Sequence, residues 1–285
     1  MIEFLGARLR RAHHVVVFTG AGVSAESGIP TFRDALSGLW ESFDPAALAA
    51  ANAFRMDPAL VWGWYEWRRA MVLAAIPNPA HLAITKLSDQ LPKLTLITQN
   101  VDDLHERAGC HEVIHLHGSL NTPRCFACAR PYKWNIEAEH EIKNMCRIEP
   151  PRCQHCNGKI RPGVVWFGES LPEQPWRKAL AAAKDCDLLL SIGTSGLVQP
   201  AAEIPRIARE HGALIVHINL DSEAFEEEKA FRLVGRAAEI LPRLLDQMSE
   251  EQRFPRESPN KPSVMRESPQ HLIRAAHEPD ELFRL

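Results

Sequence analysis

The stretch His14–Arg33, HVVVFTGAGVSAESGIPTFR, decides the fold. It begins with an apolar, β-branched run, Val15–Phe18, which predicts a buried strand. The next residues, Thr19–Gly22 (TGAG), are small and let a backbone approach a ligand closely. Exposed backbone N–H groups at the start of a helical turn suit a pyrophosphate. The glycine spacing fits the loose dinucleotide-binding pattern, which is weak by itself because glycine-rich turns after strands are common.

Beyond this loop, strand-like apolar runs alternate with helical patterns along the chain. Such alternation predicts an α/β fold, a doubly wound parallel sheet with helices on both faces. The predicted strands are 15–18, 94–98, 113–116, 164–166, 188–192 and 214–218. The predicted helices are 2–11, 81–91, 176–183, 201–211 and 236–248.

Two segments interrupt the alternation and are predicted to form a second, smaller lobe. Residues 46–75 are rich in Ala, Trp and Leu, and Asp57-Pro58 marks a boundary between two helices there. Residues 121–161 have little apolar periodicity and contain two Cys-x-x-Cys pairs, whose spacing supplies four thiolates to a tetrahedral zinc ion. The predicted ligands are Cys125, Cys128, Cys153 and Cys156. Since this segment cannot form a large core, the metal would organise it; the alternative is two unrelated pairs of buried cysteines.

The composition is that of an ordinary globular protein, with 45% hydrophobic residues, 24% charged residues and a formal net charge of −3. This balance gives no electrostatic reason to expect a nucleic acid or an anionic membrane as a partner. No apolar run is long enough to span a bilayer, and the N-terminal region lacks a signal-peptide core. We therefore expect a cytoplasmic protein in which the seven cysteines are not organised by disulfides.

Polar turns follow four of the predicted strands. They are Thr98–Asp102 (TQNVD), His117–Ser119 (HGS), Gly193–Ser195 (GTS) and Asn219–Asp221 (NLD). The carboxyl ends of parallel strands meet at one edge of an open sheet, where α/β proteins bind their ligands. The sequence therefore predicts a ligand site that these turns share with the glycine loop.

Taken together, the motifs of this chain resemble those of the sirtuins, a family of NAD-dependent protein-lysine deacylases. The resemblance rests on GAGVSAESGIPTFR, TQNVDDLHERAG, HLHGSL, the two Cys-x-x-Cys pairs, PGVVWFGESLP, GTSGLVQPAA and INLD, in family order over residues 10–245. It implies NAD as a co-substrate and one structural zinc ion. It also implies a Rossmann-like NAD-binding domain (1–34, 76–120 and 162–250), a helical module (35–75), a zinc-ribbon module (121–161) and a flexible tail (251–285).

Carried over position by position, the resemblance implies two catalytic residues. His117 would accept a proton from a ribose hydroxyl, which suits a side chain whose ordinary pKa is near ~6.5, and Asn100 would act beside it. A lone histidine can also merely satisfy a backbone group, but the complete set of motifs favours catalysis. The implied NAD contacts are Gly20, Ala21, Gly22, Ser24, Ala25, Thr31, Phe32, Arg33, Gln99, Asn100, Asp102, Gly193, Thr194, Ser195, Asn219, Leu220, Asp221 and Ala237. The implied contacts with a substrate peptide, which would pair with them as an added strand, are Val164, Trp166, Phe167 and Gly168.

The helical segment contains Tyr65 and Arg68, which are three residues apart and therefore lie on one face of a helix. The pair resembles the Tyr-x-x-Arg of class III sirtuins, which recognise acidic acyl groups such as succinyl and malonyl. A guanidinium can bind a carboxylate through two parallel hydrogen bonds, and a phenol can add a third. The alternative is a solvated Arg68 beside a half-buried Tyr65, and the neighbouring Arg69 faces elsewhere on the helix.

Two rival functions are consistent with parts of the sequence. An NAD-dependent dehydrogenase would need an acidic residue at the end of its second strand, about 20 residues past the glycine loop. That region is instead an aromatic and alanine-rich helical insertion. A zinc-ribbon nucleic-acid binder would use the basic residues of 121–161, but glutamates are mixed among them. We rank both below a monomeric deacylase that acts on acyl-lysine proteins or peptides, with no membrane or nucleic-acid partner.

Overall fold

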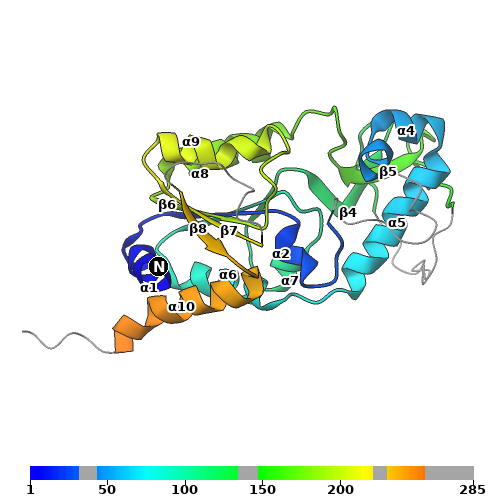
Figure 1. Cartoon of the computed structure of the whole chain (residues 1–285). Coiled ribbons are helices and arrows are strands. Elements are labelled where there is room, and N and C mark those ends of the chain that lie inside the picture. The colour runs from blue at the N-terminus through cyan, green and yellow to red at the C-terminus, as the bar shows by residue number, and fades with distance from the viewer. Residues whose placement is uncertain (32–43, 134–146, 221–229, 254–285) are drawn as a thin grey trace, which may run out of the picture.

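The computed structural model describes residues 1–31, 44–133, 147–220 and 230–253. Its centre is a sheet of six parallel strands in the order β3-β2-β1-β6-β7-β8 (Figure 1). The strands are β1 (Val15–Thr19), β2 (Leu94–Thr98), β3 (Val113–His115), β6 (Leu188–Ile192), β7 (Leu214–Asn219) and β8 (Phe231–Val234). The predicted α/β class and parallel sheet are confirmed.

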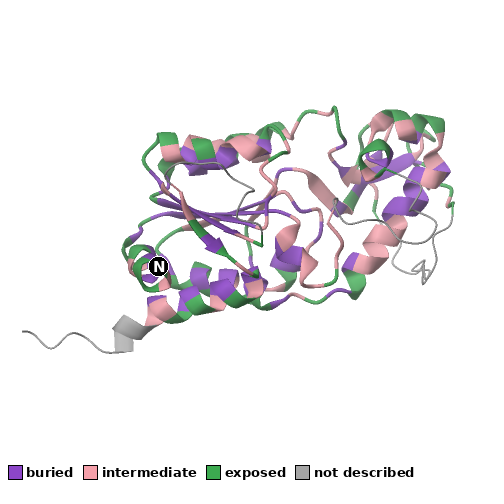
Figure 2. Ribbon diagram, viewed as in Figure 1, coloured by how far each residue is buried: buried purple, intermediate pink, exposed green. Residues whose placement is uncertain are grey.

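Helices cover both faces of this sheet because successive side chains of a strand point to opposite sides. Val15 and Val17 pack with the helices of one face, and Val16 and Phe18 pack with those of the other. The first face holds α1 (Ile2–Arg11), α6 (Pro79–Gln90) and α10 (Ala237–Arg253). The second holds α8 (Glu173–Asp185) and α9 (Ile204–Glu210), the latter preceded by the 3-10 turn Ala201–Glu203. Figure 2 shows the central strands β1, β6 and β7 buried between these two layers.

A smaller lobe lies at one end of the sheet (Figure 1). It combines α3 (Pro45–Leu48), α4 (Ala51–Met56) and α5 (Pro58–Ala74) with an antiparallel pair, β4 (Gly118–Cys125) and β5 (Ile160–Val164). The predicted boundary at Asp57-Pro58 is where α5 begins: the Asp57 carboxylate accepts a hydrogen bond from the Leu60 N–H, and Pro58 fits the first turn.

One sequence-based expectation about the strands of the main sheet was wrong, and one of its strands was missed. Residues 164–166 do not add a strand to the main sheet, because β5 ends at Val164 and pairs with β4 instead. Val164 and Trp166 are apolar because they are buried against the small lobe, not because they are strand residues of the sheet. The edge strand β8 was missed, since only Leu233 of its four residues is buried.

A short helix lies in the loop that follows each of two central strands. They are α2 (Gly22–Ala25), which follows β1, and α7 (Leu104–Arg107), which follows β2. Both lie at the carboxyl edge of the sheet, between the sheet and the small lobe (Figure 1). Within the described ranges, no helix has the length and apolar character needed to cross a membrane.

Candidate active site

A cleft of about 540 Å³ lies between the carboxyl edge of the sheet and the small lobe, a volume typical of small-molecule sites. Every described residue that the sequence predicted as a catalytic, NAD or substrate contact lines it. These residues are Gly20, Ala21, Gly22, Ser24, Ala25, Thr31, Tyr65, Arg68, Gln99, Asn100, Asp102, His117, Val164, Trp166, Phe167, Gly168, Gly193, Thr194, Ser195, Asn219, Leu220 and Ala237. The predicted contacts Phe32, Arg33 and Asp221 lie outside the described residues.

The glycine loop after β1 crosses the loop after β6 at very short range. The Gly22 N–H donates to the Gly193 carbonyl at 2.8 Å. A Cβ added at Gly22 would lie 2.7 Å from the Gly193 Cα, and one added at Gly193 would lie 2.5 Å from the Val23 nitrogen. Gly193 also has a φ of +59°. These glycines therefore allow two backbones to meet, in addition to leaving the cleft open for a dinucleotide.

His117 occupies the turn between β3 and β4. Its Nδ1 lies 3.1 Å from the Gln99 carbonyl, which can only accept, so Nδ1 carries the proton. Burial lowers the pKa of His117 below its ordinary value, and the bond to the Gln99 carbonyl opposes this only in part. Nε2 is therefore unprotonated at neutral pH and is available as a base.

Asn100 is fixed through both its side chain and its backbone. Its Nδ2 donates to Ser24 Oγ at 3.0 Å, and its backbone N–H donates to Thr98 Oγ1 at 3.0 Å. Its carbonyl accepts from His115 Nδ1 at 3.1 Å, and the other ring nitrogen of His115 lies 2.7 Å from Glu106 Oε1. Burial alone would lower the pKa of His115, but the hydrogen bond and charge of Glu106 raise it overall. The imidazole of His115 thus holds the Asn100 backbone at the wall of the cleft.

Tyr65 and Arg68 lie on the small-lobe side of the same cleft, on α5. The Tyr65 hydroxyl accepts a hydrogen bond from Trp166 Nε1 at 3.1 Å, and burial raises the pKa of Tyr65 to about 12. The Arg68 Cζ lies 6.0 Å from the centre of the Tyr65 ring and 5.1 Å from that of Trp64. Burial lowers the pKa of Arg68, while Tyr65 and Asp102 act to raise it. The cleft therefore contains a partly buried guanidinium beside a buried, neutral phenol.

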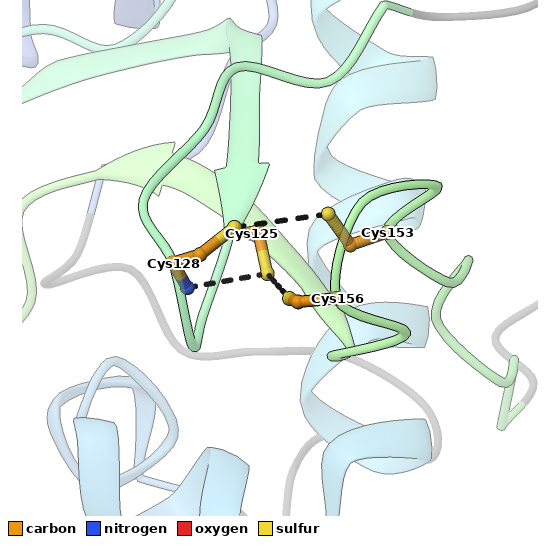
Figure 3. A group of neighbouring side chains, drawn as sticks. All are labelled: Cys125, Cys128, Cys153 and Cys156. Carbon is orange, nitrogen blue, oxygen red and sulfur yellow. Dashed lines mark hydrogen bonds between the residues drawn. The ribbon is translucent and has the colours of Figure 1, made fainter.

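The four predicted zinc ligands meet in the small lobe, where β4 ends (Figure 3). Their sulfur atoms all lie within 4.8 Å of one another, with Cys125 and Cys156 at 3.5 Å and Cys128 and Cys153 at 3.8 Å. Four sulfurs at the usual zinc–sulfur distance of about 2.3 Å in a tetrahedron are about 3.8 Å apart. The donor set therefore fits one zinc ion whose four positions are all filled by thiolates.

The two knuckles share one backbone design. A residue with positive φ follows the second cysteine of each, Ala129 at 58° and Asn157 at 57°. Their N–H groups donate back to the carbonyls of Cys125 and Cys153, at 3.0 and 2.9 Å. This repeated turn brings the two cysteines of each pair to one side, as a common metal requires.

Sequence reasoning missed several residues of the cleft. They are Glu26, Ile29, Pro30, Ala49, Val72, Val101, Val165, Glu169, Leu171, Val198, Gln199, Ile218 and Gly235. Most of them lie inside or beside the motifs, so their position was a usable signal. Ala49 and Val72 carry no such signal, because tertiary packing alone brings them there; the Ala49 carbonyl, for example, accepts from the Phe167 N–H at 2.9 Å.

The sequence matches the model of the Sir2 family over residues 20–200. It is 61% identical over 237 residues to a protein of Pseudomonas aeruginosa named NAD-dependent protein deacylase 1, covering 83% of this chain and 95% of that protein.

Solved structures agree with the sequence match. A mutant Sir2 homologue in complex with 2′-O-acetyl ADP ribose has a TM-score of 0.80 and 41% identity, covering 90% of this chain and 100% of that one. A Sir2 complex with a p53 peptide and NAD+ has a TM-score of 0.73 and 32% identity, covering 86% of this chain and 97% of that one.

Proposed function

This chain belongs to the Sir2 family and is an NAD-dependent protein deacylase, and we propose that it prefers acyl-lysines whose acyl group ends in a carboxylate, such as succinyl-lysine. The observation that carries the preference is the position of Tyr65 and Arg68, which line the same cleft as His117. An acetyl or fatty acyl group carries no charge. A terminal carboxylate can accept charge-assisted hydrogen bonds from the Arg68 guanidinium, and such bonds are about twice as strong as neutral ones.

Residues at the carboxyl edge of the sheet would carry out the steps of deacylation that are the same for every acyl group. NAD supplies an anomeric carbon that loses nicotinamide and takes up the acyl oxygen. Nε2 of His117 accepts the proton of a ribose hydroxyl, while Nδ1 stays bonded to the Gln99 carbonyl and keeps the ring in place. Asn100 is held between Ser24 and His115 and orients the nicotinamide side of the dinucleotide.

The substrate peptide would lie along residues 164–168 and extend them as a strand. The Val165 N–H donates to the His117 carbonyl at 2.8 Å, so this segment lies directly beside the proposed base. The acyl-lysine side chain would then enter the cleft between His117 and Arg68. We further propose that the enzyme acts as a monomer in the cytoplasm, where a reducing environment keeps four cysteines available for zinc.

The test compares acetyl-, malonyl- and succinyl-lysine forms of one peptide, with and without NAD, by mass spectrometry. We expect Arg68→Met to lower kcat/KM for the two acidic substrates by roughly 10- to 100-fold, the value of hydrogen bonds to a charged group. Arg69→Met is the matched control: Arg69 is the next residue of α5, pairs with Glu66 at 3.9 Å and is not among the residues that line the cleft.

Equal losses in the two arginine variants would mean that helix α5 has been damaged and not that a carboxylate contact has been lost. Undiminished removal of succinyl and malonyl groups by Arg68→Met would rule out the proposed preference. Turnover of acetyl-lysine by that variant would still identify a deacylase.

A further inference from the structure

We propose that Trp166 is a positioning residue for acyl selectivity: its indole N–H fixes the phenol oxygen of Tyr65 as an acceptor and so directs the phenol proton to the carboxylate of the substrate. This inference rests on the proposed preference for acidic acyl groups. It adds that the selectivity of the Tyr65–Arg68 pair depends on a residue of the peptide-binding segment.

The hydrogen bonds of Tyr65 support this role. A phenol has one proton to donate and an oxygen that can accept. The oxygen accepts from Trp166 Nε1 at 3.1 Å, and this is the only hydrogen bond of the hydroxyl among the described residues. Burial keeps the phenol neutral, so the proton is present at neutral pH. With the acceptor side occupied, the proton is left to face the cleft that Tyr65 lines.

Trp166 can fix another side chain because its own ring is held firmly. Trp166 is 1% exposed, and the Arg161 Cζ lies 3.5 Å from the centre of its ring. Phe54 and Phe126 pack around it with ring centres at 5.4 and 6.1 Å. A cation stacked at this distance on a desolvated indole is a strong contact. The direction of the indole N–H is therefore set before any substrate binds.

An ion pair between buried Arg161 and partly buried Glu169 holds both the Trp166 ring and the backbone of this segment. Arg161 is 4% exposed and donates to both oxygens of Glu169 and to the Val164 carbonyl, the last at 2.9 Å. Glu169 Oε2 also accepts from the Trp166 backbone N–H at 2.9 Å. One guanidinium thus ties together the two ends of the segment that would bind the peptide. The same group positions the indole that bonds to Tyr65.

A double-mutant cycle tests the coupling, with the ratio of kcat/KM for succinyl-lysine to that for acetyl-lysine as the readout. Both substrates are measured on one preparation, so any general loss of activity cancels in the ratio. We expect Trp166→Phe and Tyr65→Phe each to lower the ratio roughly fivefold, about the value of one hydrogen bond. The double variant is expected to match Tyr65→Phe alone, since Trp166 acts only through the phenol.

Two further variants separate the N–H from the bulk of the ring. Trp166→His keeps a ring N–H, because Nε2 of histidine corresponds to Nε1 of tryptophan. We expect it to lower the succinyl-to-acetyl ratio less than Trp166→Phe does. Trp176→Phe removes an indole from α8, which packs on a face of the main sheet and does not line the cleft, and should leave the ratio unchanged.

The outcomes distinguish this inference from the function on which it rests. If neither Arg68→Met nor Tyr65→Phe lowers the ratio, the preference for acidic acyl groups is itself wrong. If Arg68→Met and Tyr65→Phe lower the ratio but Trp166→Phe does not, Tyr65 and Arg68 select the acyl group without Trp166. The same conclusion follows if the ratio in the double variant falls by the product of the two single-variant losses. If Trp166→His behaves as Trp166→Phe does, the indole contributes its shape and not its N–H.

Discussion

The six-stranded sheet and the four-cysteine lobe face the same cleft, but they are stabilised in different ways. The sheet buries apolar side chains on both faces, between two layers of helices. The small lobe has one apolar cluster, and two of its members are the zinc ligands Cys125 and Cys153. Burial of apolar side chains can hold the first region together, whereas we expect the second to need a metal in addition to its apolar cluster.

The two regions also contribute differently to the proposed site. The sheet edge supplies His117, Asn100 and the glycine loops, which would act on NAD and on the acyl oxygen that every substrate has. The lobe supplies Tyr65 and Arg68, which would contact the end of the acyl group, where substrates differ. Changes at the sheet edge should therefore affect all acyl groups alike, and changes in the lobe should affect the choice among them.

The largest effect is expected from removal of zinc. Structural zinc contributes an apparent 10–16 kcal/mol, to order of magnitude, in small zinc-binding modules, so chelation should unfold the lobe around β4 and β5. The sheet has its own cores and should remain folded. Hydrogen exchange read by mass spectrometry should show lost protection in 118–125 and 160–164 and retained protection in β1, β6 and β7. Active protein with no zinc by elemental analysis would contradict this dependence.

The next largest effect is expected from His117→Ala. Loss of a general base typically costs about 10²- to 10⁴-fold in rate, and the loss should be similar for acetyl- and succinyl-lysine. Nicotinamide release and peptide masses measure it, and a circular dichroism spectrum like that of the wild type excludes unfolding. A variant that lost only succinyl turnover would move His117 from the shared chemistry to acyl selection.

Much of the division into a main sheet and a four-cysteine lobe could be predicted from sequence, because the sequence signals for both are local. The apolar run Val15–Phe18 predicted β1, and the Cys-x-x-Cys spacing predicted the cluster at 125–156 that the structure assembles. The assigned domain boundaries and the roles of the individual site residues stay predictions.

What sequence reasoning missed depends on contacts between distant segments. The role of Arg161 was missed because it depends on contacts with the Trp166 ring and the Glu169 carboxylate, which form only in the folded chain. The bond from Trp166 to Tyr65 joins residues 101 positions apart, and no pattern of spacing could reveal it. Edge strand β8 was missed for a different reason: it has one buried residue and so lacks an apolar signal.

The smallest expected effect concerns the pH dependence of kcat/KM. It tests whether His117, at the sheet edge, acts alike on both substrates. The folded pKa of His117 is lowered, so the neutral base is fully present above that pKa and is lost as the pH falls through it. The acid limb of kcat/KM should therefore lie below the ordinary histidine pKa of 6.5. Acetyl- and succinyl-lysine peptides should give the same limb. A limb above pH 7 for both substrates would assign the titration to another group.

One measurement tests directly whether the small lobe selects an acidic acyl group for chemistry performed at the sheet edge. The zinc-loaded protein is given NAD and an equimolar mixture of the acetyl and succinyl forms of one peptide, and both masses are followed together with nicotinamide. We predict that the succinyl form is consumed first, with one nicotinamide released per acyl group removed. Earlier consumption of the acetyl form, or acyl loss without nicotinamide, would contradict the account.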